Sequence, residues 1–563
     1  MILASTSVAA AATIAVPAGG DLQAALNAAQ PGDVITLVPG ATYTGSFVLP
    51  NKGAVSDFIT IRSAAPDSQL PGPGIRMTPA YAALLPKIKS ATSVSALRTA
   101  AAANHYKLLF LEFQANSKGY GDIISLGAGD SSQTQLSQVP YAFVVDRVYV
   151  HGDPALGQKR GIALHSGDTT VVNSYVSECK AIGQDSQAIS GYNGPGPYRI
   201  ENNYLEGATE NFLLGGADPT IPNLVTTNVT FRHNYLRKQL TWRDPILATP
   251  TAVSAKAVTG GSLAAGTYYY KVQARRVAGQ TNKASSIVST EVSATIAAGT
   301  TGSVTISWTP VVDAEEYLIY GRTSASENAY WKTTNPYFTD TGAAGTAGTP
   351  ASGTKWAVKN IFELKNAQDV VVEGNVFENL WVADQPGYPI VFTPRNQNGT
   401  APWVVVQRVT FQHNIVRHTA GGVNILGTDN LAPSQLTNHI TVRHNVFDDM
   451  TAATWGSGSK AFQLGDGPDA ITIDHNTVMS TDSTILWLYG GPTTSPTPVT
   501  NAVYTNNLSL HNSYGIFGNG LSSGTTSINA YMPGGIVSRN VLAGGSASKY
   551  PTGNFFPTTA AWP

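Results

Sequence analysis

The sequence predicts an all-β fold: a single-stranded right-handed parallel β-helix with an N-terminal capping helix and an inserted β-sandwich. Three observations lead to this prediction. An asparagine motif recurs at a near-constant interval, a second series of short apolar strands keeps step with it, and a stretch of about 110 residues with a different character interrupts both.

The repeated motif consists of an apolar residue, two variable residues, Asn, a variable residue and another apolar residue. Successive asparagines lie 31, 141, 39, 31, 31, 30 and 34 residues apart. Short strands at a long fixed period indicate coils of a parallel β-helix, in which we expect the Asn side chains to stack at the turns. A β-propeller would instead need about four strands in every 40 to 45 residues. The motif occurs at Asn203, Asn234, Asn375, Asn414, Asn445, Asn476, Asn506 and Asn540.

The second strand series and the N-terminal region agree with this fold. Segments such as NFLLGGAD, residues 211–218, and IFELKN, residues 361–366, each precede an asparagine motif. Near the N-terminus, DLQAALNAAQ, residues 21–30, has the pattern of a short amphipathic helix. Because a β-helix leaves the edges of its first coil unpaired, we expect this helix to serve as a cap.

The interrupting stretch predicts a separate domain. Its segments alternate apolar and polar residues between Gly, Thr and Pro turns, which is typical of a β-sandwich. Within residues 250–352, SVTISWTPVVDAEEYLIYGRT and GTYYYKVQA resemble fibronectin type III domains, and the resemblance implies a spacer or binding module. We therefore divide the chain into an N-terminal β-helix part with its cap, 1–245, the insert, 246–354, and a C-terminal β-helix part, 355–563.

Composition limits the partners of the protein. Charged residues make up 12% of the 563 residues, and 34 Lys and Arg against 35 Asp and Glu leave a net charge of −1. Such a balance argues against a nucleic-acid or anionic-membrane partner. The single cysteine, Cys179, excludes an internal disulfide and a CxxC site.

The sequence also bears on localisation. No uninterrupted apolar run reaches the roughly 18 residues of a membrane-spanning helix. No Lys or Arg precedes Lys52, so the basic region of a signal peptide is not evident. A composition poor in charge and rich in Gly, Asn, Ser and Thr nevertheless favours a secreted protein.

A candidate site follows from the alternation of side chains along a strand. If Phe362 and Leu364 point inward, Glu363 and Lys365 point outward side by side. Arg395 lies 30 residues after Lys365, about one period, so the neighbouring coil brings it close. We expect other polar residues on the same face or its edge, with an aromatic residue and an arginine where the insert begins. These are Asp185, Gln187, Asn211, Asp218, Asn396, Asn424 and Gln463, together with Trp242 and Arg243.

A Lys and an Arg on adjacent coils suit β-elimination from a uronic acid. The proton next to a carboxylate becomes acidic enough only when a cation neutralises that carboxylate. A Lys acts as the base if its pKa of about 10.4 falls toward neutrality. The charge of Glu363 opposes this fall unless a cation such as Ca²⁺ engages it, so we expect Glu363 and Asp218 as calcium ligands.

The sequence resembles known families at these residues. The coils as a whole resemble the pectate-lyase-like β-helix superfamily. The segment FELKNAQDVVVEGNVFEN followed by IVFTPRNQNG resembles the part of alginate-lyase and chondroitinase-B-type lyases in which a strand Lys is the base and an Arg one coil later assists. The resemblance implies that Lys365 is the base, Arg395 its partner and Glu363 a calcium ligand. Asn366 and Asn396 depart from the family, which has Ser and His there, and the loop WVADQPGY lengthens the interval.

Two other classes of function remain open. A glycoside hydrolase on the same fold would use paired carboxylates, such as Asp185 with Glu210 or Asp218, or Asp448 with Asp449. A non-catalytic adhesin or tailspike-like β-helix would only hold the glycan.

Other chemistries find less support. The histidines that precede repeat asparagines, among them His413, His444 and His475, are interpreted as turn packing rather than as a metal site. The sequence contains no phosphate-binding loop, no GxSxG and no HExxH, and we expect no organic cofactor. The identity of the glycan and the number of subunits stay open.

Overall fold

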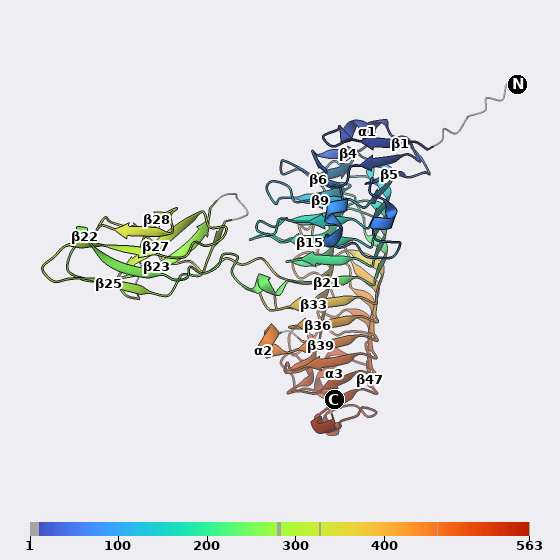
Figure 1. Ribbon diagram of the computed structural model, residues 1–563. Helices are drawn as coiled ribbons and strands as arrows, with labels where there is room; N and C mark the ends of the chain where they lie inside the picture. The colour runs from blue at the N-terminus through green and yellow to red at the C-terminus, as the bar shows by residue number, and fades with distance from the viewer. Residues whose placement is uncertain (1–10, 278–282, 326–327, 459, 562–563) are drawn as a thin grey trace, which may run out of the picture. The chain divides into compact units, whose positions relative to one another are not determined.

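The computed structural model describes residues 11–277, 283–325, 328–458 and 460–561 (Figure 1). The chain divides into two compact units. The first comprises Met1–Lys180, Asp185–Lys238 and Val358–Pro563, and the second Ala181–Gln184 and Gln239–Ala357. The first ten residues, where the sequence lacks a basic signal region, lie outside the described part. None of the described helices is both long and apolar enough to cross a bilayer.

The first unit consists of coils that each contribute strands to three long parallel sheets, A, B and C, of 14, 13 and 12 strands in the described residues. The predicted right-handed parallel β-helix is thereby confirmed (Figure 1). Sheet A runs in the order β1 (Thr13–Val16), β2 (Val34–Leu37), β5 (Ile59–Ser63), β8 (Asn104–Leu109), β11 (Tyr141–Asp146), β14 (Gly167–Val172), β17 (Gly196–Glu201), β20 (Thr226–Arg232), β32 (Ala367–Glu373), β35 (Val406–Gln412), β38 (Asn438–Arg443), β41 (Asp469–Asp474), β44 (Val503–Thr505) and β47 (Ile536–Ser538).

Sheets B and C keep the same order of coils. Sheet B contains β3 (Thr42–Thr44), β6 (Lys87–Lys89), β9 (Glu112–Gln114), β12 (Tyr149–His151), β15 (Tyr175–Cys179), β18 (Tyr204–Gly207), β21 (Tyr235–Arg237), β33 (Val376–Leu380), β36 (Ile415–Thr419), β39 (Val446–Met450), β42 (Thr477–Ser480), β45 (Leu508–Leu510) and β48 (Val541–Ala543). Sheet C contains β4 (Phe47–Leu49), β7 (Leu97–Thr99), β10 (Asp122–Leu126), β13 (Arg160–Leu164), β16 (Gln187–Gly191), β19 (Glu210–Leu214), β31 (Phe362–Leu364), β34 (Ile390–Phe392), β37 (Val423–Leu426), β40 (Phe462–Gly465), β43 (Thr484–Tyr489) and β46 (Gly515–Gly518).

Helices of the first unit are few and short. The predicted cap is confirmed as α1 (Leu22–Ala28), whose first turn is closed by Asp21, because its carboxylate accepts a hydrogen bond from the Ala24 N–H. Leu22 and Leu26 of this helix are buried. The other helices are α2 (Ala452–Trp455), α3 (Thr525–Tyr531), η1 (Asp67–Gln69), η2 (Pro79–Leu84), η3 (Leu136–Gln138), η5 (Ala547–Lys549) and η6 (Thr559–Ala561).

The second unit is antiparallel. Its two sheets share one core that includes Tyr270, Ile306 and Ile319. This is the packing of a β-sandwich, while the likeness to fibronectin type III domains stays a prediction. One sheet contains β22 (Ser254–Leu263), β26 (Gly302–Ser307) and β29 (Tyr337–Asp340), and the other contains β23 (Gly266–Arg276), β24 (Ala284–Ser285), β25 (Val292–Ile296), β27 (Glu316–Arg322), β28 (Ala329–Thr333) and β30 (Thr346–Ala347), with η4 (Leu240–Arg243) preceding them.

The asparagine motif forms a continuous hydrogen-bonded ladder inside the turn between sheets A and B. Asn234 and Asn375, 141 residues apart, are neighbours in it, since the Asn234 N–H donates to Asn375 Oδ1 at 2.8 Å. The second unit therefore interrupts the sequence between two adjacent coils. The ladder runs through Asn203, Asn234, Asn375, Asn414, Asn445, Asn476, Asn507, Asn540 and Asn554.

One predicted member of this ladder is wrong by a single residue. Asn507, not Asn506, accepts from the Asn476 N–H. Tyr504, not Val503, pairs in register with the inward Ile473, so the motif begins one residue later than the pattern predicted. Asn506 instead has a left-handed backbone with φ of 56°.

The same left-handed position explains the histidine column. His413, His444 and His475 each precede a ladder asparagine and have φ between 52° and 55°. Asn, Gly and His tolerate this region better than most residues. The rings of His413 and His444 stack with centroids 5.3 Å apart, and His444 and His475 lie 4.9 Å apart. Their place in the turn accounts for them, as predicted.

Candidate functional site

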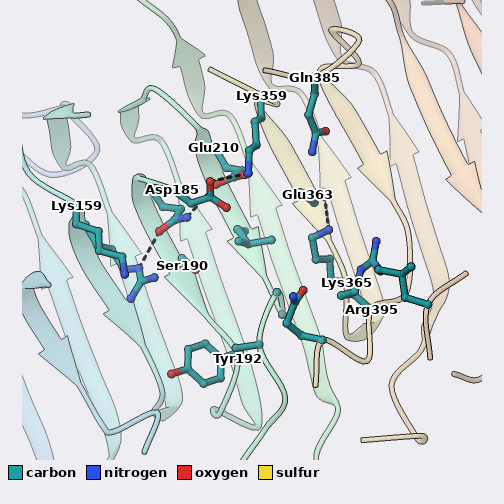
Figure 2. A pocket seen from close by; sticks show the side chains of 18 residues that line it. Lys159, Asp185, Ser190, Tyr192, Glu210, Lys359, Glu363, Lys365, Gln385 and Arg395 are labelled. Carbon is teal, nitrogen blue, oxygen red and sulfur yellow. Dashed lines mark hydrogen bonds and ion pairs between the residues drawn. The ribbon is translucent and has the colours of Figure 1, made fainter. Parts of the chain in front are cut away.

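A polar pocket of about 620 Å³ opens on the outer face of sheet C (Figure 2). Its lining includes five cationic and three acidic side chains, all from the first unit. Because charged residues make up only 12% of the chain, so many in one pocket distinguish it from the rest of the surface. The eight are Lys159, Arg160, Lys359, Lys365, Arg395, Asp185, Glu210 and Glu363.

Strand β31 directs Glu363 and Lys365 into this pocket. Phe362 and Leu364 are fully buried in the core, in register with Ile390 and Phe392 of β34, as the alternation predicted. The intervening Glu363 and the following Lys365 therefore share the outer face. Lys365 Nζ lies 2.9 Å from Glu363 Oε1, and 18% of the Lys365 side chain is exposed against 4% for Glu363.

Arg395 lies one coil beyond Lys365, as the 30-residue interval predicted. Its backbone N–H donates to the Lys365 carbonyl at 3.1 Å. Its guanidinium Nη1 donates to Asp429 Oδ1 at 2.8 Å, and the Asp429 side chain is fully covered. This buried carboxylate holds the guanidinium in place beside Lys365 (Figure 2).

A glycine sets the spacing of the coils beneath Lys365. Gly215 follows strand β19 with φ of 98°, a conformation that side chains with a Cβ rarely adopt. A Cβ on Gly215 would lie 2.8 Å from the Lys365 Cβ and equally close to the Asn366 backbone nitrogen. Glycine is thus required for the close approach that presents Lys365 to the pocket.

A row of polar side chains crosses four coils at the other side of the pocket. Asp122, Arg160, Gln187 and Glu210 pair in register on successive strands of sheet C. Arg160 Nη1 donates to Asp122 Oδ1 at 2.9 Å and its Nε to Gln187 Oε1 at 3.1 Å. Gln187 Nε2 then donates to Glu210 Oε2 at 2.9 Å. Each side chain therefore fixes the orientation of the next.

The carboxyl group of Glu210 has a raised pKa. Burial raises its pKa, and the charges of Glu363 and Asp185 add to the rise, which brings the pKa to about 8. Asp185 in turn pairs with Lys359, whose Nζ lies 2.6 Å from Asp185 Oδ1. Although burial lowers the pKa of Lys359, the Asp185 hydrogen bond and the nearby acids raise it overall.

A buried lysine supports the turn that carries Glu210. Lys238 is fully buried, and its Nζ donates to the carbonyls of Gly207 and Ala208 at 2.7 and 2.8 Å, with the Thr209 carbonyl at 3.3 Å. Burial lowers the pKa of Lys238, while the charge of Glu210 opposes this effect. Lys238 thus supplies a hydrogen-bond partner to the Gly207 and Ala208 carbonyls, whereas the Thr209 carbonyl also accepts from the backbone N–H of Asn360.

The structure places Asn211 in the interior, which corrects its predicted position on the outer face. Its N–H and that of Phe212 both donate to the Ile361 carbonyl at 3.0 Å. Two residues opposite one form a bulge, which shifts the alternation of side chains by one. Glu210 consequently faces the pocket, and the Asn211 amide donates to the Leu205 and Arg237 carbonyls.

Other predicted residues hold loops or line another pocket. Asp218 Oδ2 accepts hydrogen bonds from Asn398 and Thr400, and the buried Asn396 bonds Ala401 and Pro433. Neither lines the charged pocket, which is a correction for both. Asp185 and Gln187 do line it, whereas Asn424 and Gln463 line a second pocket on sheet C. Trp242, which is buried, and Arg243 belong to the second unit.

The predicted calcium ligands, Glu363 and Asp218, each have a partner within the protein, and their binding of calcium stays a prediction. Calcium takes about six to eight oxygen ligands. Asp218 Oδ2 is occupied by loop hydrogen bonds and Glu363 by Lys365. Across the described ranges, no group of three or more His, Cys, Asp or Glu side chains is arranged to hold a metal ion.

Several site residues escaped the sequence prediction. Arg160 precedes Gln187 by 27 residues, close to one period, so the repeat offered a signal for it. Asp429 and Lys238 lie in turns of variable length, where the repeat gives none. Glu210 was considered only as one of a pair of hydrolytic carboxylates.

Solved structures that are similar to this chain share little sequence with it. The sequence matches no protein-family model, and no curated protein matches it. An α-1,3-glucanase catalytic unit from Streptomyces thermodiastaticus is 12% identical, with 100% of this chain and 72% of that one covered and a TM-score of 0.45. A PL6 family polysaccharide lyase from Pseudopedobacter saltans is 10% identical over 98% and 94%, with a TM-score of 0.40. An alginate lyase from Paenibacillus sp. is 13% identical over 76% and 99%, with a TM-score of 0.28.

The chain has a parallel β-helix fold. Its three parallel sheets establish the architecture on their own. Because a fold hosts many activities, the argument about function rests on the pocket rather than on these likenesses.

Proposed function

We propose that the protein is a secreted polysaccharide lyase that cleaves an acidic, uronate-containing glycan by β-elimination. The observation that carries this proposal is the position of Lys365 beside Arg395 on the next coil, in an open pocket lined by five cations and three acids. With Glu210 protonated, the excess of positive charge grows further. Such a lining favours a substrate that carries carboxylates.

In this reaction Arg395 pairs with the uronate carboxylate and stabilises the negative charge that develops on it. Lys365 takes the proton from the carbon next to the carboxylate. The electron pair of that C–H bond forms a double bond to the adjacent ring carbon, and the bond from this carbon to the glycosidic oxygen breaks. The products are an unsaturated uronate and a shortened chain.

The departing glycosidic oxygen needs a proton. Glu210 lines the same pocket, and its raised pKa keeps that proton on the carboxyl group at neutral pH. We assign it as the general acid. Asp429 acts on the reaction only through Arg395 and is therefore a positioning residue.

A glycoside hydrolase is the second candidate, and the protonated Glu210 favours it. An acid of raised pKa beside other carboxyl groups, here Glu363 and Asp185, is the arrangement that hydrolysis of a glycosidic bond requires. Water would then be added across the broken bond and no double bond would form. Lys365 would have no role in proton abstraction.

The product of the reaction separates these candidates. The purified full-length chain is incubated with a panel of uronate-containing and neutral polysaccharides. We expect new reducing ends together with the ultraviolet absorbance of an unsaturated uronate. Reducing ends without that absorbance would establish hydrolysis. If neither signal appeared, a glycan-binding β-helix would be the remaining candidate.

The assignment of the base has its own test. Lys365→Ala should abolish the formation of unsaturated product, while Lys107→Ala, on strand β8 of sheet A, should leave it unchanged. Both variants should melt like the wild type, because an outer side chain contributes little to packing. Full activity of Lys365→Ala on a proven substrate would exclude this lysine as the base.

A further inference from the structure

A second pocket, of about 320 Å³, follows the charged one along sheet C. It lies over strands β34, β37, β40 and β43, and Gln385 lines both pockets. Unlike the first pocket, it has no charged side chain in its lining as far as the described residues show. Amide and aromatic side chains dominate it: Asn360, Tyr388, Asn424, Gln463, Trp487 and Tyr489.

The amides of this second pocket are held in fixed orientations. Asn424, Gln463 and Trp487 pair in register on successive coils. Gln463 Nε2 donates to Asn424 Oδ1 at 2.9 Å, and the Tyr388 hydroxyl donates to Gln463 Oε1 at 2.6 Å. Amide groups offer a donor and an acceptor side by side, which complements neighbouring hydroxyl groups of a sugar.

The aromatic side is equally built. The half-exposed Trp487 stacks on Tyr489 with ring centroids 4.9 Å apart. Gly465 lies opposite Tyr489 on the preceding coil, and a Cβ there would lie 2.1 Å from the Tyr489 ring carbon Cζ. The glycine therefore lets the phenol lie flat against the sheet. A half-exposed indole next to fixed amides suits a ligand with an apolar face and a hydroxylated edge, as a sugar ring has.

Asn360 points to a ligand independently. It lines the pocket and is 1% exposed, yet among the described residues neither its amide nitrogen nor its amide oxygen has a hydrogen-bond partner. An unpaired amide in the interior is costly. Sugar hydroxyls in the pocket would supply both a donor and an acceptor for it.

We infer that this second pocket binds an uncharged sugar of the same glycan, so that the substrate carries a neutral sugar near the uronate that is cleaved. A uronate carboxylate placed here would lose water without gaining a cation. The inference rests on the proposed function for the uronate in the first pocket, whereas the binding of a neutral sugar by the second pocket is measured separately.

The test uses the full-length chain and calorimetric titration with neutral gluco-, manno-, galacto- and xylo-oligosaccharides and with a homo-oligouronate. We expect at least one neutral oligosaccharide to bind. Trp487→Ala and Gln463→Leu should each weaken that binding about 10-fold, and Trp487→Phe, which keeps a ring, should weaken it less. Lys365→Ala should bind the neutral oligosaccharide like the wild type. Melting curves show which variants are folded. If Trp487→Ala is not folded, the test uses Gln463→Leu alone.

Two results would overturn the inference. In one, none of the four neutral oligosaccharides binds the wild type. In the other, Trp487→Ala weakens the binding of the homo-oligouronate as much as the binding of the neutral sugar, which would make the second pocket a uronate site. Failure of the lyase proposal looks different, because unsaturated product would be missing while the neutral sugar still bound and still depended on Trp487.

Discussion

Replacement of Asn445 by alanine should destabilise the β-helix by about 4 kcal/mol. The Asn445 amide donates to the Phe411 carbonyl and to Asn476 Oδ1, both at 3.0 Å. Its Oδ1 accepts from the Asn414 N–H at 2.9 Å and the Asn414 amide at 3.1 Å. With about 1 kcal/mol for each of four hydrogen bonds in a site that is 1% exposed, the sum is about 4 kcal/mol.

Urea unfolding measures this loss of stability. Hydrogen exchange at the backbone N–H of Asn414 shows whether unfolding begins in the ladder. Asn445→Asp should cost more than alanine, because a buried carboxylate would face the Phe411 carbonyl and Asn476 Oδ1. Asn398→Ala is the control, since Asn398 is exposed and the backbone N–H that it gives to Asp218 is retained. A loss below about 1 kcal/mol, or an aspartate variant as stable as the wild type, would refute the reasoning.

Three further changes test the charged pocket. Glu210→Gln should gain thermal stability relative to the wild type as the pH rises from 4.5 to about 8, because the folded wild type keeps a proton there that the unfolded chain has lost; equal pH profiles of Tm would contradict the raised pKa. Asp429→Asn should lower kcat/KM on an acidic glycan about 10-fold by loosening Arg395, with little change in Tm. Lys238→Met should lower the free energy of unfolding by about 3 to 5 kcal/mol, since the Gly207 and Ala208 carbonyls lose their partner in the interior, and a melt like that of the wild type would exclude this role.

The repeat made the placement of Lys365 and Arg395 predictable. Inward residues such as Phe362 recur at one period, and once they are aligned, the outer residues between them follow from alternation alone. The second unit did not disturb this alignment of inward residues, because the chain leaves one coil before the unit and enters the next coil after it. The hydrogen bond between Asn234 and Asn375 demonstrates this. Regular strands therefore carry their geometry in the sequence.

Residues outside the regular strands could not be predicted in this way. Asp429 reaches Arg395 from a turn whose length differs from coil to coil. Lys238 is an ionisable residue that ordinary burial preferences place on the surface, and only the carbonyls of a particular turn make its interior position favourable. The predicted position of Asn211 on the outer face was wrong, because a bulge has no signature in a pattern of apolar and polar residues.

That bulge repeats, and its repetition connects the two pockets. The N–H groups of Ile361 and Phe362 both donate to the Pro389 carbonyl, as those of Asn211 and Phe212 do to Ile361. Asn360 precedes the inward Phe362 by two residues, as Glu210 precedes Phe212, and those two phenylalanines pair in register. The same backbone device thus directs an acid into the first pocket and an amide into the second. Because both pockets are built on the same backbone arrangement, the difference in charge between them lies in the side chains alone. Exchange of these side chains would alter the preference of such a fold between charged and neutral sugars.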